Sequence, residues 1–364
     1  MRTCRGCGEP RLIRVLDLGM APPADHFPPE PVAGEEITYP LAMDLCEDCG
    51  LAQLAEDGTV AEEPRGVEPQ ALRDQAAAAV TLVADAGWLP GRTVREFGSP
   101  HGGSWLGLLA ERSFTPVAEE PADVVLDCFG IMHEPDQASA FRRRAAATAP
   151  GGVLLLQYHT LETIVAHGQW NALRHGHFAY YSRRALGRLL GAAGMSIQAR
   201  WHFDLYGGTE LVACRHITDG ALDAPQETTS DHTSDDTMAR LRAGELQRAA
   251  DRHTSELAAW LRDRRRDGAS VAAYGAASRA VALFALAGVD RELVGAVADA
   301  SAAKHGRRMP GTDIPVVSPT ELVAMDPDLV LLTLPDLLDE VSAQLPALEG
   351  RWVSIDRLGS RGYG

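Results

Sequence analysis

Two Cys-x-x-Cys pairs constrain the fold of the N-terminal region more than any other feature of the sequence. The pairs are Cys4/Cys7 and Cys46/Cys49, each followed by glycine. Four thiolates can surround one Zn²⁺, and such a closed tetrahedral site is structural because no position is left for water or substrate. The alternative is a pair of disulfides or buried free thiols. The 38 residues between the pairs predict a small subdomain folded between them.

Charge and hydropathy exclude several classes of partner. The net charge of −16 and the isoelectric point near 5.2 argue against binding to nucleic acid or to an anionic membrane. The sequence shows no hydrophobic leader and no membrane-spanning run, so we expect a cytoplasmic protein. Disulfides are disfavoured in that compartment, which favours zinc at the four cysteines.

The 364 residues are enough for two or three domains with cores of their own. The alternation of predicted strands and helices indicates an α/β fold in two of these parts. We expect a zinc-binding module at 1–54, an α/β core at 70–216, a linker with a connecting helix at 217–267, and a second α/β lobe at 268–364. The linker is rich in Thr, Asp and Ser up to residue 237, and one highly charged helix is expected at about 238–267.

The α/β core contains a candidate nucleotide-binding turn. A strand predicted at 93–98 runs into a glycine-rich turn and a helix, which is how an α/β fold holds a nucleotide-like ligand. Glu96, Gly98 and Gly102 are therefore candidate cofactor-binding residues. Pro150-Gly-Gly before a buried strand is typical of Rossmann-like S-adenosylmethionine methyltransferases. Helices are expected at 70–88, 104–112 and 137–148, and strands at 93–98, 122–129 and 150–157.

The C-terminal region predicts a second Rossmann-like lobe. Ser270–Ser278 is another strand that runs into a Gly/Ala turn and a helix. Runs at 293–299, 328–333 and 352–356 supply three more strands, so we expect four strands of a parallel sheet.

The order of these parts resembles one family, the C-methyltransferases that act on nucleotide-activated keto-deoxysugars in antibiotic biosynthesis. The resemblance covers nearly the whole chain. It depends on these stretches: Val15–Asp25, Tyr39–Leu54, His175-x-His177-Phe-x-Tyr180-Tyr-Ser182, Tyr206–Ala213, Tyr274-Gly-Ala-Ala and Asp299…Lys304-His-Gly-Arg-Arg-Met-Pro-Gly311.

The resemblance implies a reaction and a base. In the family, a histidine removes a proton next to a sugar ketone, and the enolate attacks the methyl group of S-adenosylmethionine. That base is the second histidine of a Tyr-His-Glu-His motif, which matches His177, with His175 as the first. Imidazole suits the role because its pKa lies near working pH. Tyr180 is a candidate wall of the site. The alternatives are that both histidines only hydrogen-bond within a polar turn and that Tyr180 is a core residue.

The resemblance also implies a nucleotide diphosphate-sugar as substrate, held by the C-terminal lobe. The Tyr274-Gly275-Ala276-Ala277 turn opens a helix whose N–H groups suit a diphosphate. Added positive charge could come from Arg279, which stands where the family has lysine or a similar residue, and from Lys304, Arg307 and Arg308. For each basic residue the alternative is a solvated surface side chain.

Several positions depart from the family pattern. Arg174 and Gly176 replace the first tyrosine and the glutamate of the histidine motif. Only nine residues, Ser113–Pro121, separate the helix at 104–112 from the next strand, whereas a strand-helix-strand crossover takes about 30. The acid that holds the cofactor ribose is missing there, and Glu119 or Glu120 could replace it. The core is therefore expected to be truncated, and S-adenosylmethionine is expected to bind weakly or not at all.

Three functions remain open from the sequence. The first is an enzyme that forms the enolate but no longer methylates it, giving an epimerase, isomerase or eliminase. The second is a methyltransferase with a reduced cofactor pocket. The third is a catalytically silent partner that binds sugar nucleotides.

Overall fold

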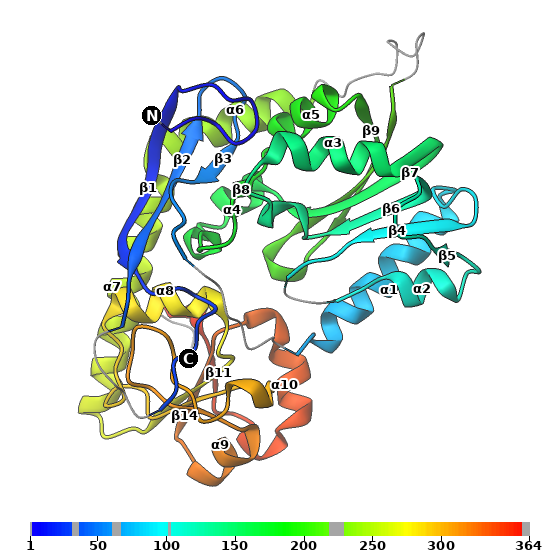
Figure 1. Cartoon of the computed structure of the whole chain (residues 1–364). Coiled ribbons are helices and arrows are strands. Elements are labelled where there is room, and N and C mark those ends of the chain that lie inside the picture. The colour runs from blue at the N-terminus through cyan, green and yellow to red at the C-terminus, as the bar shows by residue number, and fades with distance from the viewer. Residues whose placement is uncertain (1, 31–35, 60–66, 101–102, 218–228, 359–364) are drawn as a thin grey trace.

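The computed structural model confirms the α/β class, with a small N-terminal sheet, a central α/β core and a C-terminal α/β lobe (Figure 1). The structure describes residues 2–30, 36–59, 67–100, 103–217 and 229–358. Within these ranges, helices that combine the length and the apolar character needed to cross a membrane are absent.

The N-terminal sheet is antiparallel and contains one strand from elsewhere in the chain. Helices α7 and α8 pack against its first strand, which buries this sheet between the other parts. The last strand in the order is supplied by the core, so the histidine motif just before it is held against this sheet. The strands, in spatial order, are β1 (Leu12–Ala21), β2 (Tyr39–Cys46), β3 (Ala52–Leu54) and β8 (Ala179–Tyr180).

The core is a six-stranded sheet with helices on both faces. The side-chain period of two explains the layers: Leu155 of β7 faces α1 and α2, whereas Leu154 and Leu156 face α3 and α5. The strands, in spatial order, are β5 (Thr115–Pro116), β4 (Thr93–Phe97), β6 (Ala122–Cys128), β7 (Thr148–His159), β10 (Thr209–His216) and β9 (Met195–Phe203). The helices are α1 (Gln70–Asp85), α2 (Leu106–Ala110), α3 (Gln137–Ala147), α4 (Leu161–Ala166) and α5 (Arg183–Ala192).

The predicted truncation of the core is present in the structure. The segment between α2 and β6 forms one strand of two residues, β5, which pairs in parallel with β4. No helix lies between Glu111 and Pro121, all of which the structure describes. Strand β4 pairs directly with β6 on its other side, so the sheet ends one strand beyond β4.

The connection to the C-terminal lobe differs from the expectation of one helix after a linker. Helix α6 (Thr229–Arg242) begins inside the stretch expected to be linker, and α7 (Glu245–Arg266) follows it. The two are separated at Gly244, whose φ of 74° lies in the left-handed region that glycine adopts readily. Polar composition suggested a linker here, but packing against α4 and α5 supports a helix.

The C-terminal lobe contains a parallel sheet of five strands, one more than expected. The addition is β13, a two-residue edge strand. The strands, in spatial order, are β13 (Val316–Val317), β12 (Val297–Ala298), β11 (Val271–Tyr274), β14 (Leu329–Leu332) and β15 (Trp352–Ser354). The helices are α8 (Ser278–Ala287), α9 (Pro319–Met325) and α10 (Leu338–Gln344).

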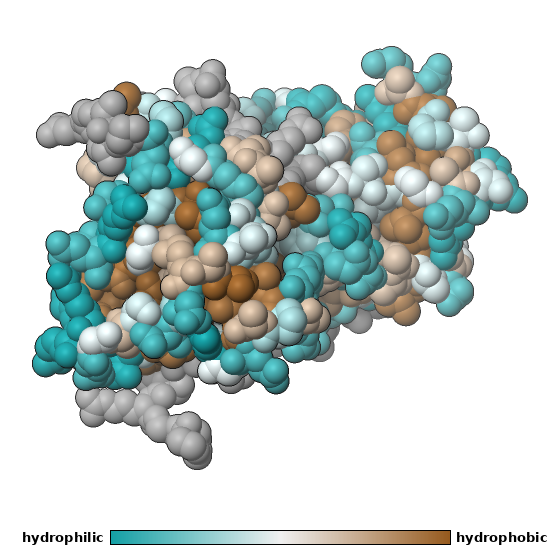
Figure 2. All heavy atoms as spheres, turned by 90° about the horizontal axis from the view of Figure 1, so that it is seen from below, coloured by the Kyte–Doolittle hydropathy of each residue, from teal (hydrophilic) through white to brown (hydrophobic). Residues whose placement is uncertain are grey.

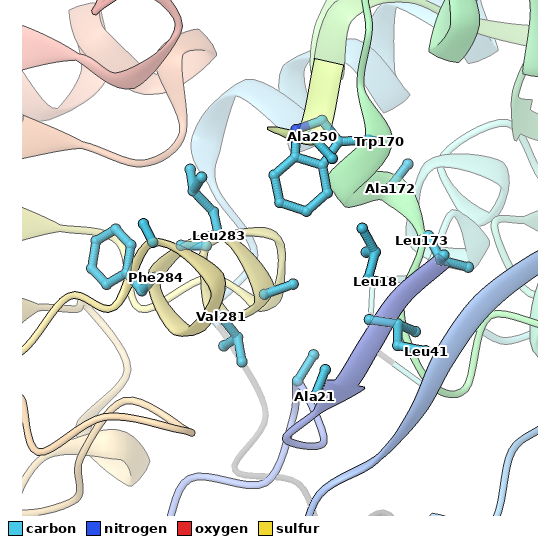
Figure 3. Close-up of a cluster of buried hydrophobic side chains, with 14 of the residues drawn as sticks. Leu18, Ala21, Leu41, Trp170, Ala172, Leu173, Ala250, Val281, Leu283 and Phe284 are labelled. Atoms are coloured by element: carbon cyan, nitrogen blue, oxygen red, sulfur yellow. The ribbon is translucent and has the colours of Figure 1, made fainter. Parts of the chain in front are cut away.

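One hydrophobic cluster joins the three parts (Figure 3). Leu18 and Leu41 from the N-terminal sheet lie near Leu173 of the core and Val281 of α8. Because these side chains are buried together, the parts are held against each other by apolar packing.

The outer surface seen from below is mostly hydrophilic, with small apolar areas between polar side chains (Figure 2).

Candidate functional site

The four cysteines form the predicted metal centre. All four Sγ atoms lie within 4.8 Å of one another, and Cys4–Cys49 and Cys7–Cys46 are separated by 3.5 and 3.6 Å. Four thiolates at about 2.3 Å from Zn²⁺ would lie about 3.8 Å apart in a tetrahedron. The thiols are not joined as disulfides. The donor set therefore fits a closed structural zinc site.

Local backbone contacts shape each half of this centre. The N–H groups of Gly8 and Gly50 donate to the carbonyls of Cys4 and Cys46, with both glycines at a φ of 79°. A hydrogen bond from Cys49 lowers the pKa of Cys4 to about 5, and the same contact raises the pKa of Cys49. The thiolate form of Cys4 is thus favoured by its contact with Cys49, and a bound Zn²⁺ would stabilise the thiolate form of all four cysteines.

A cleft of about 430 Å³ lies where the three parts meet. It is lined by Asp25 and Phe27 of the N-terminal module, by the ends of β6 and β7 of the core, and by the N-terminus of α8 of the C-terminal lobe. The carboxyl ends of parallel strands are where open α/β sheets bind ligands. This cleft is the candidate active site. The sequence-predicted residues that line it are His177, Tyr180, Tyr274, Gly275, Ala277, Arg279 and Lys304.

His177 lies in the cleft beside a second histidine. Its ring is T-shaped against that of His133, with the ring centroids 4.4 Å apart. His133 Nδ1 lies 2.9 Å from the carbonyl oxygen of Gly176, which can only accept, so Nδ1 carries the hydrogen. In the neutral ring the lone pair of His133 is then on Nε2. The pair places two imidazoles at one wall of the cleft.

Arg174 contacts His177 directly. Its Nε donates to His177 Nε2 at 2.8 Å, and its Nη1 donates to Ser278 Oγ at the start of α8. Its backbone N–H donates to the hydroxyl of Tyr180 at 3.2 Å. Tyr180 is 1% exposed, and burial raises its pKa. Tyr180 thus supports the loop that carries Arg174 as well as lining the cleft.

Arg279 crosses the cleft in the opposite direction, from α8 to the core. Its Nη2 donates to Nδ1 of His159 at 3.3 Å, and its guanidinium lies 5.6 Å from the ring centroid of Tyr206. Burial, followed by repulsion from Arg174, lowers the pKa of Arg279 to about 10. Burial also lowers the pKa of His159 well below its ordinary value, so His159 is a neutral acceptor for the guanidinium.

The turn before α8 is built for close approach of a ligand. Gly275 has a φ of 96°, and Ala276 N–H donates to Asp299 Oδ2 at 2.8 Å. Lys304 Nζ donates to Ala276 O at 2.8 Å and lies 3.2 Å from Asp299 Oδ2. The charge of Lys304 is therefore paired with Asp299 and holds the turn. The helix N-terminus that follows can receive an anion.

Replacing Gly275 should strain this turn. A Cβ there would lie 2.5 Å from Thr333 Oγ1, in addition to the unfavourable φ. We expect Gly275→Ala to lower the free energy of unfolding by about 1–3 kcal/mol, measured by urea denaturation. Gly295→Ala in the same lobe is the control, because its nearest contacts are at 3.7 and 3.8 Å. Equal losses in the two variants would contradict this account of the turn.

Several predicted residues do not line the cleft, among them His175, Arg307 and Arg308. His175 Nε2 contacts Pro40 O at 3.2 Å, and burial lowers the pKa of this histidine. Arg307 Nη1 donates to Phe27 O at 2.7 Å, and Arg308 forms a buried ion pair with Glu36 at 2.6 Å. These side chains join the N-terminal module to the core and the C-terminal lobe. The two arginines therefore contact the N-terminal module and do not line the cleft.

Three family models match consecutive parts of the chain. They are a zinc binding domain at residues 4–62, a methyltransferase domain at 53–199, and a C-methyltransferase C-terminal domain at 211–354. The chain thus matches a zinc binding domain, a methyltransferase domain and a C-methyltransferase C-terminal domain in sequence order. A similar protein is the C-methyltransferase NovU of Streptomyces niveus, 24% identical over 384 residues, which cover 92% of this chain and 91% of that protein.

Solved structures match part of this chain at low similarity. Magnesium protoporphyrin IX methyltransferase of Synechocystis PCC 6803 is 12% identical, covering 42% of this chain and 90% of that one, with a TM-score of 0.30. The 1,6-didemethyltoxoflavin-N1-methyltransferase of Burkholderia thailandensis is 15% identical, covering 47% and 98%, with a TM-score of 0.30. With identities of 12% and 15% and TM-scores of 0.30, these matches support no conclusion about the activity of this chain.

The residues expected to hold S-adenosylmethionine make contacts within their own segment or do not line the cleft, in the part of the chain that the structure describes. Glu96 accepts from Ser104 Oγ at 2.6 Å and from Trp105 N–H at 2.7 Å, so both its oxygens serve its own loop. Glu119 and Glu120 are exposed and do not line the cleft. Gly98 directly follows β4 and does not line the cleft, and Gly102 lies outside the described residues.

The comparisons do not support the expected loss of this cofactor. The methyltransferase domain model matches residues 53–199 across the shortened segment. The domain match favours binding of S-adenosylmethionine, whereas the contacts of the expected cofactor residues do not. A measurement of S-adenosylmethionine binding to the purified protein distinguishes the two.

Sequence reasoning missed four residues that line the cleft: Arg174, His133, His159 and Tyr206. In the sequence, Arg174 stands out only as a departure from the histidine motif. Tyr206 has a φ of 58°, an unusual conformation for a tyrosine that a sequence does not reveal. His133 lies in the turn after β6 and His159 is the last residue of β7, and these positions at the carboxyl ends of buried strands are the signal that could find them.

Proposed function

We propose that this protein binds a nucleotide diphosphate-sugar that carries a ketone, and that it removes a proton from the carbon next to that ketone without efficient methyl transfer. The observation that carries the proposal is an asymmetry of the cleft. The residues for proton abstraction and for an anionic substrate line it, whereas no carboxylate from β5 or the segment after it does, within the described residues.

The proton step uses His177. The C–H electrons of the substrate remain on carbon as an enolate, and the proton moves to an imidazole nitrogen. A proton returned to the opposite face would give an epimer. Return at the oxygen-bearing neighbour would shift the carbonyl, and departure of a β-substituent would give elimination. His177 is 5% exposed, so the ring is largely shielded from water by its surroundings.

The α8 end of the cleft supports this substrate class. The N-terminus of α8 and Arg279 supply partial and full positive charge beside the Gly275 turn. A diphosphate there would place the sugar toward the core, where His177 lies. Electrostatic complementarity of this kind is notable in a chain whose net charge is −16.

A second candidate function is methyl transfer to the same carbon. The match to a methyltransferase domain at residues 53–199 favours it. S-adenosylmethionine would supply the methyl group when bound. The third possibility, binding of a sugar nucleotide without turnover, is an outcome of the same test.

Incubation of thymidine and uridine diphosphate keto-sugars in D₂O tests the proposal. We expect deuterium at one carbon without methylation, and we expect His177→Ala to reduce exchange by at least about 100-fold. His202→Ala is the control, because His202 is exposed and lies outside the cleft. Mass spectrometry and proton NMR measure both products.

Each other outcome has a defined meaning. Methylated product at micromolar S-adenosylmethionine would establish the second function. Binding by calorimetry without exchange would establish the third. Lack of binding at millimolar nucleotide sugar would overturn the substrate class.

A further inference from the structure

Two arginine side chains, those of Arg174 and Arg279, line the cleft without a carboxylate partner in the part of the chain that the structure describes. Within the described ranges, no Asp or Glu oxygen lies within 4.0 Å of the guanidinium of Arg174 or Arg279, although the structure has many such ion pairs elsewhere. Each one crosses between the core and the C-terminal lobe, Arg174 to Ser278 and Arg279 to His159. Two half-buried cations that repel each other are costly unless an anion joins them.

The position of Arg174 also affects the proton-abstracting residue. A guanidinium can only donate, so His177 Nε2 accepts the 2.8 Å hydrogen bond with its lone pair. While this bond persists, that nitrogen cannot take a proton from a substrate. The nitrogen becomes available only when Arg174 moves toward another acceptor.

We propose that Arg174 and Arg279 bind an anionic group of the substrate between them, and that this contact removes Arg174 from His177. The inference rests on the proposed function, in which the anion is the diphosphate of a nucleotide sugar. Arg174 is then a positioning residue that keeps the base occupied until substrate is bound. Ser278, which begins α8, lies at the same point and adds a hydroxyl and a helix N-terminus.

The arrangement of the neighbouring loop supports this role. Gly176 has a φ of 80°, its N–H donates to Asp57 at 2.6 Å, and its carbonyl faces His133. Gly176 is therefore fixed by its backbone contacts. Arg174 is held at its backbone by Tyr180, but within the described residues its side chain hydrogen-bonds to His177 and Ser278, neither of which is anionic. A phosphate oxygen would be a stronger acceptor than either.

Calorimetry with inorganic pyrophosphate and with uridine diphosphate-glucose tests the site in the full chain. We expect Arg174→Gln and Arg279→Gln each to weaken binding of both probes by about 10- to 100-fold, the value of one charge-assisted hydrogen bond. Arg266→Gln is the matched control, because it removes the same charge from an exposed side chain outside the cleft. Circular dichroism confirms that each variant is folded.

A second measurement reports on His177 itself. The ¹⁵N resonance of His177 Nε2 should shift on addition of pyrophosphate to the parent, and the free Arg174→Gln variant should already show the shifted position. Parent-like binding by Arg174→Gln, or an unchanged resonance with pyrophosphate bound, would overturn the inference and leave the proposed function intact. Failure of the parent to bind either probe would overturn both.

Discussion

Replacement of Cys46 by serine should unfold the N-terminal module and destroy the cleft. Loss of one thiolate removes most of the affinity for zinc, and structural zinc contributes about 10–16 kcal/mol of apparent binding energy in small domains. That exceeds the net stability of most domains, about 5–15 kcal/mol. Strand β3 pairs with β8 of the core, and Asp25 and Phe27 line the cleft, so damage to this module reaches the site.

Elemental analysis and thermal unfolding measure this effect. The parent should contain one zinc per chain, and a chelator should lower its unfolding temperature as the Cys46→Ser variant does. Cys128→Ser is the control. Cys128 lies outside the metal centre, so this variant should retain zinc. A parent without zinc, or a Cys46→Ser variant that melts with the parent, would refute the structural role of the metal.

Arg144→Leu should lower the free energy of unfolding by about 3–5 kcal/mol. Arg144 Nε lies 2.8 Å from Asp127 Oδ2, and their side chains are 2% and 0% exposed. The other oxygen of Asp127 accepts from the N–H groups of Gly130 and Ile131, which shape the turn before His133. Without Arg144 a buried carboxylate is left without its counterion. Urea denaturation at pH 7 measures the loss.

The neighbouring residue provides a matched control. Arg143 pairs with Glu134 but is 49% exposed, so Arg143→Leu should cost about 1 kcal/mol or less. Similar losses in the two variants would mean that the buried pair contributes no more than a surface one.

The loss in Arg144→Leu should also depend on pH. Burial raises the pKa of Asp127, and the charge of Arg144 lowers it in part. In the Arg144→Leu variant the pKa of Asp127 should therefore be higher than in the parent. A carboxyl whose pKa is raised on folding favours the folded state below its unfolded pKa, near 3.9, and this stability is lost as pH rises through the folded pKa. The difference from the parent should therefore be small near pH 4 and should grow toward pH 7. A difference independent of pH would contradict an uncompensated charge at Asp127.

The sequence predicted the elements better than the contacts between them. Buried strands such as β6 and β7 have strong local patterns, and the spacing of the cysteines specifies a metal site. The break at Gly244 and the early start of α6 were missed because the polar composition of that region hides helices that are supported by packing.

The roles of single charged residues could not be read from their neighbours in sequence. Arg307 contacts a carbonyl 280 positions away, and Arg279 contacts His159 at a separation of 120. Both arginines look alike in the sequence, yet one fastens two modules together and the other faces the cleft. Only the relative placement of the modules decides which role each has.

The shortened core sheet also bears on whether its edge could pair with another molecule. Loss of the outer crossover leaves β5 as an edge that could pair with a strand of another molecule. Thr115 and Val117 direct their N–H groups toward β4, so the donor facing outward belongs to the residue between them. That residue is Pro116, which has no N–H. At Pro116 the edge of the shortened sheet therefore offers no N–H donor to an incoming strand. The sheet can be short on this side without presenting a complete template for edge-to-edge aggregation.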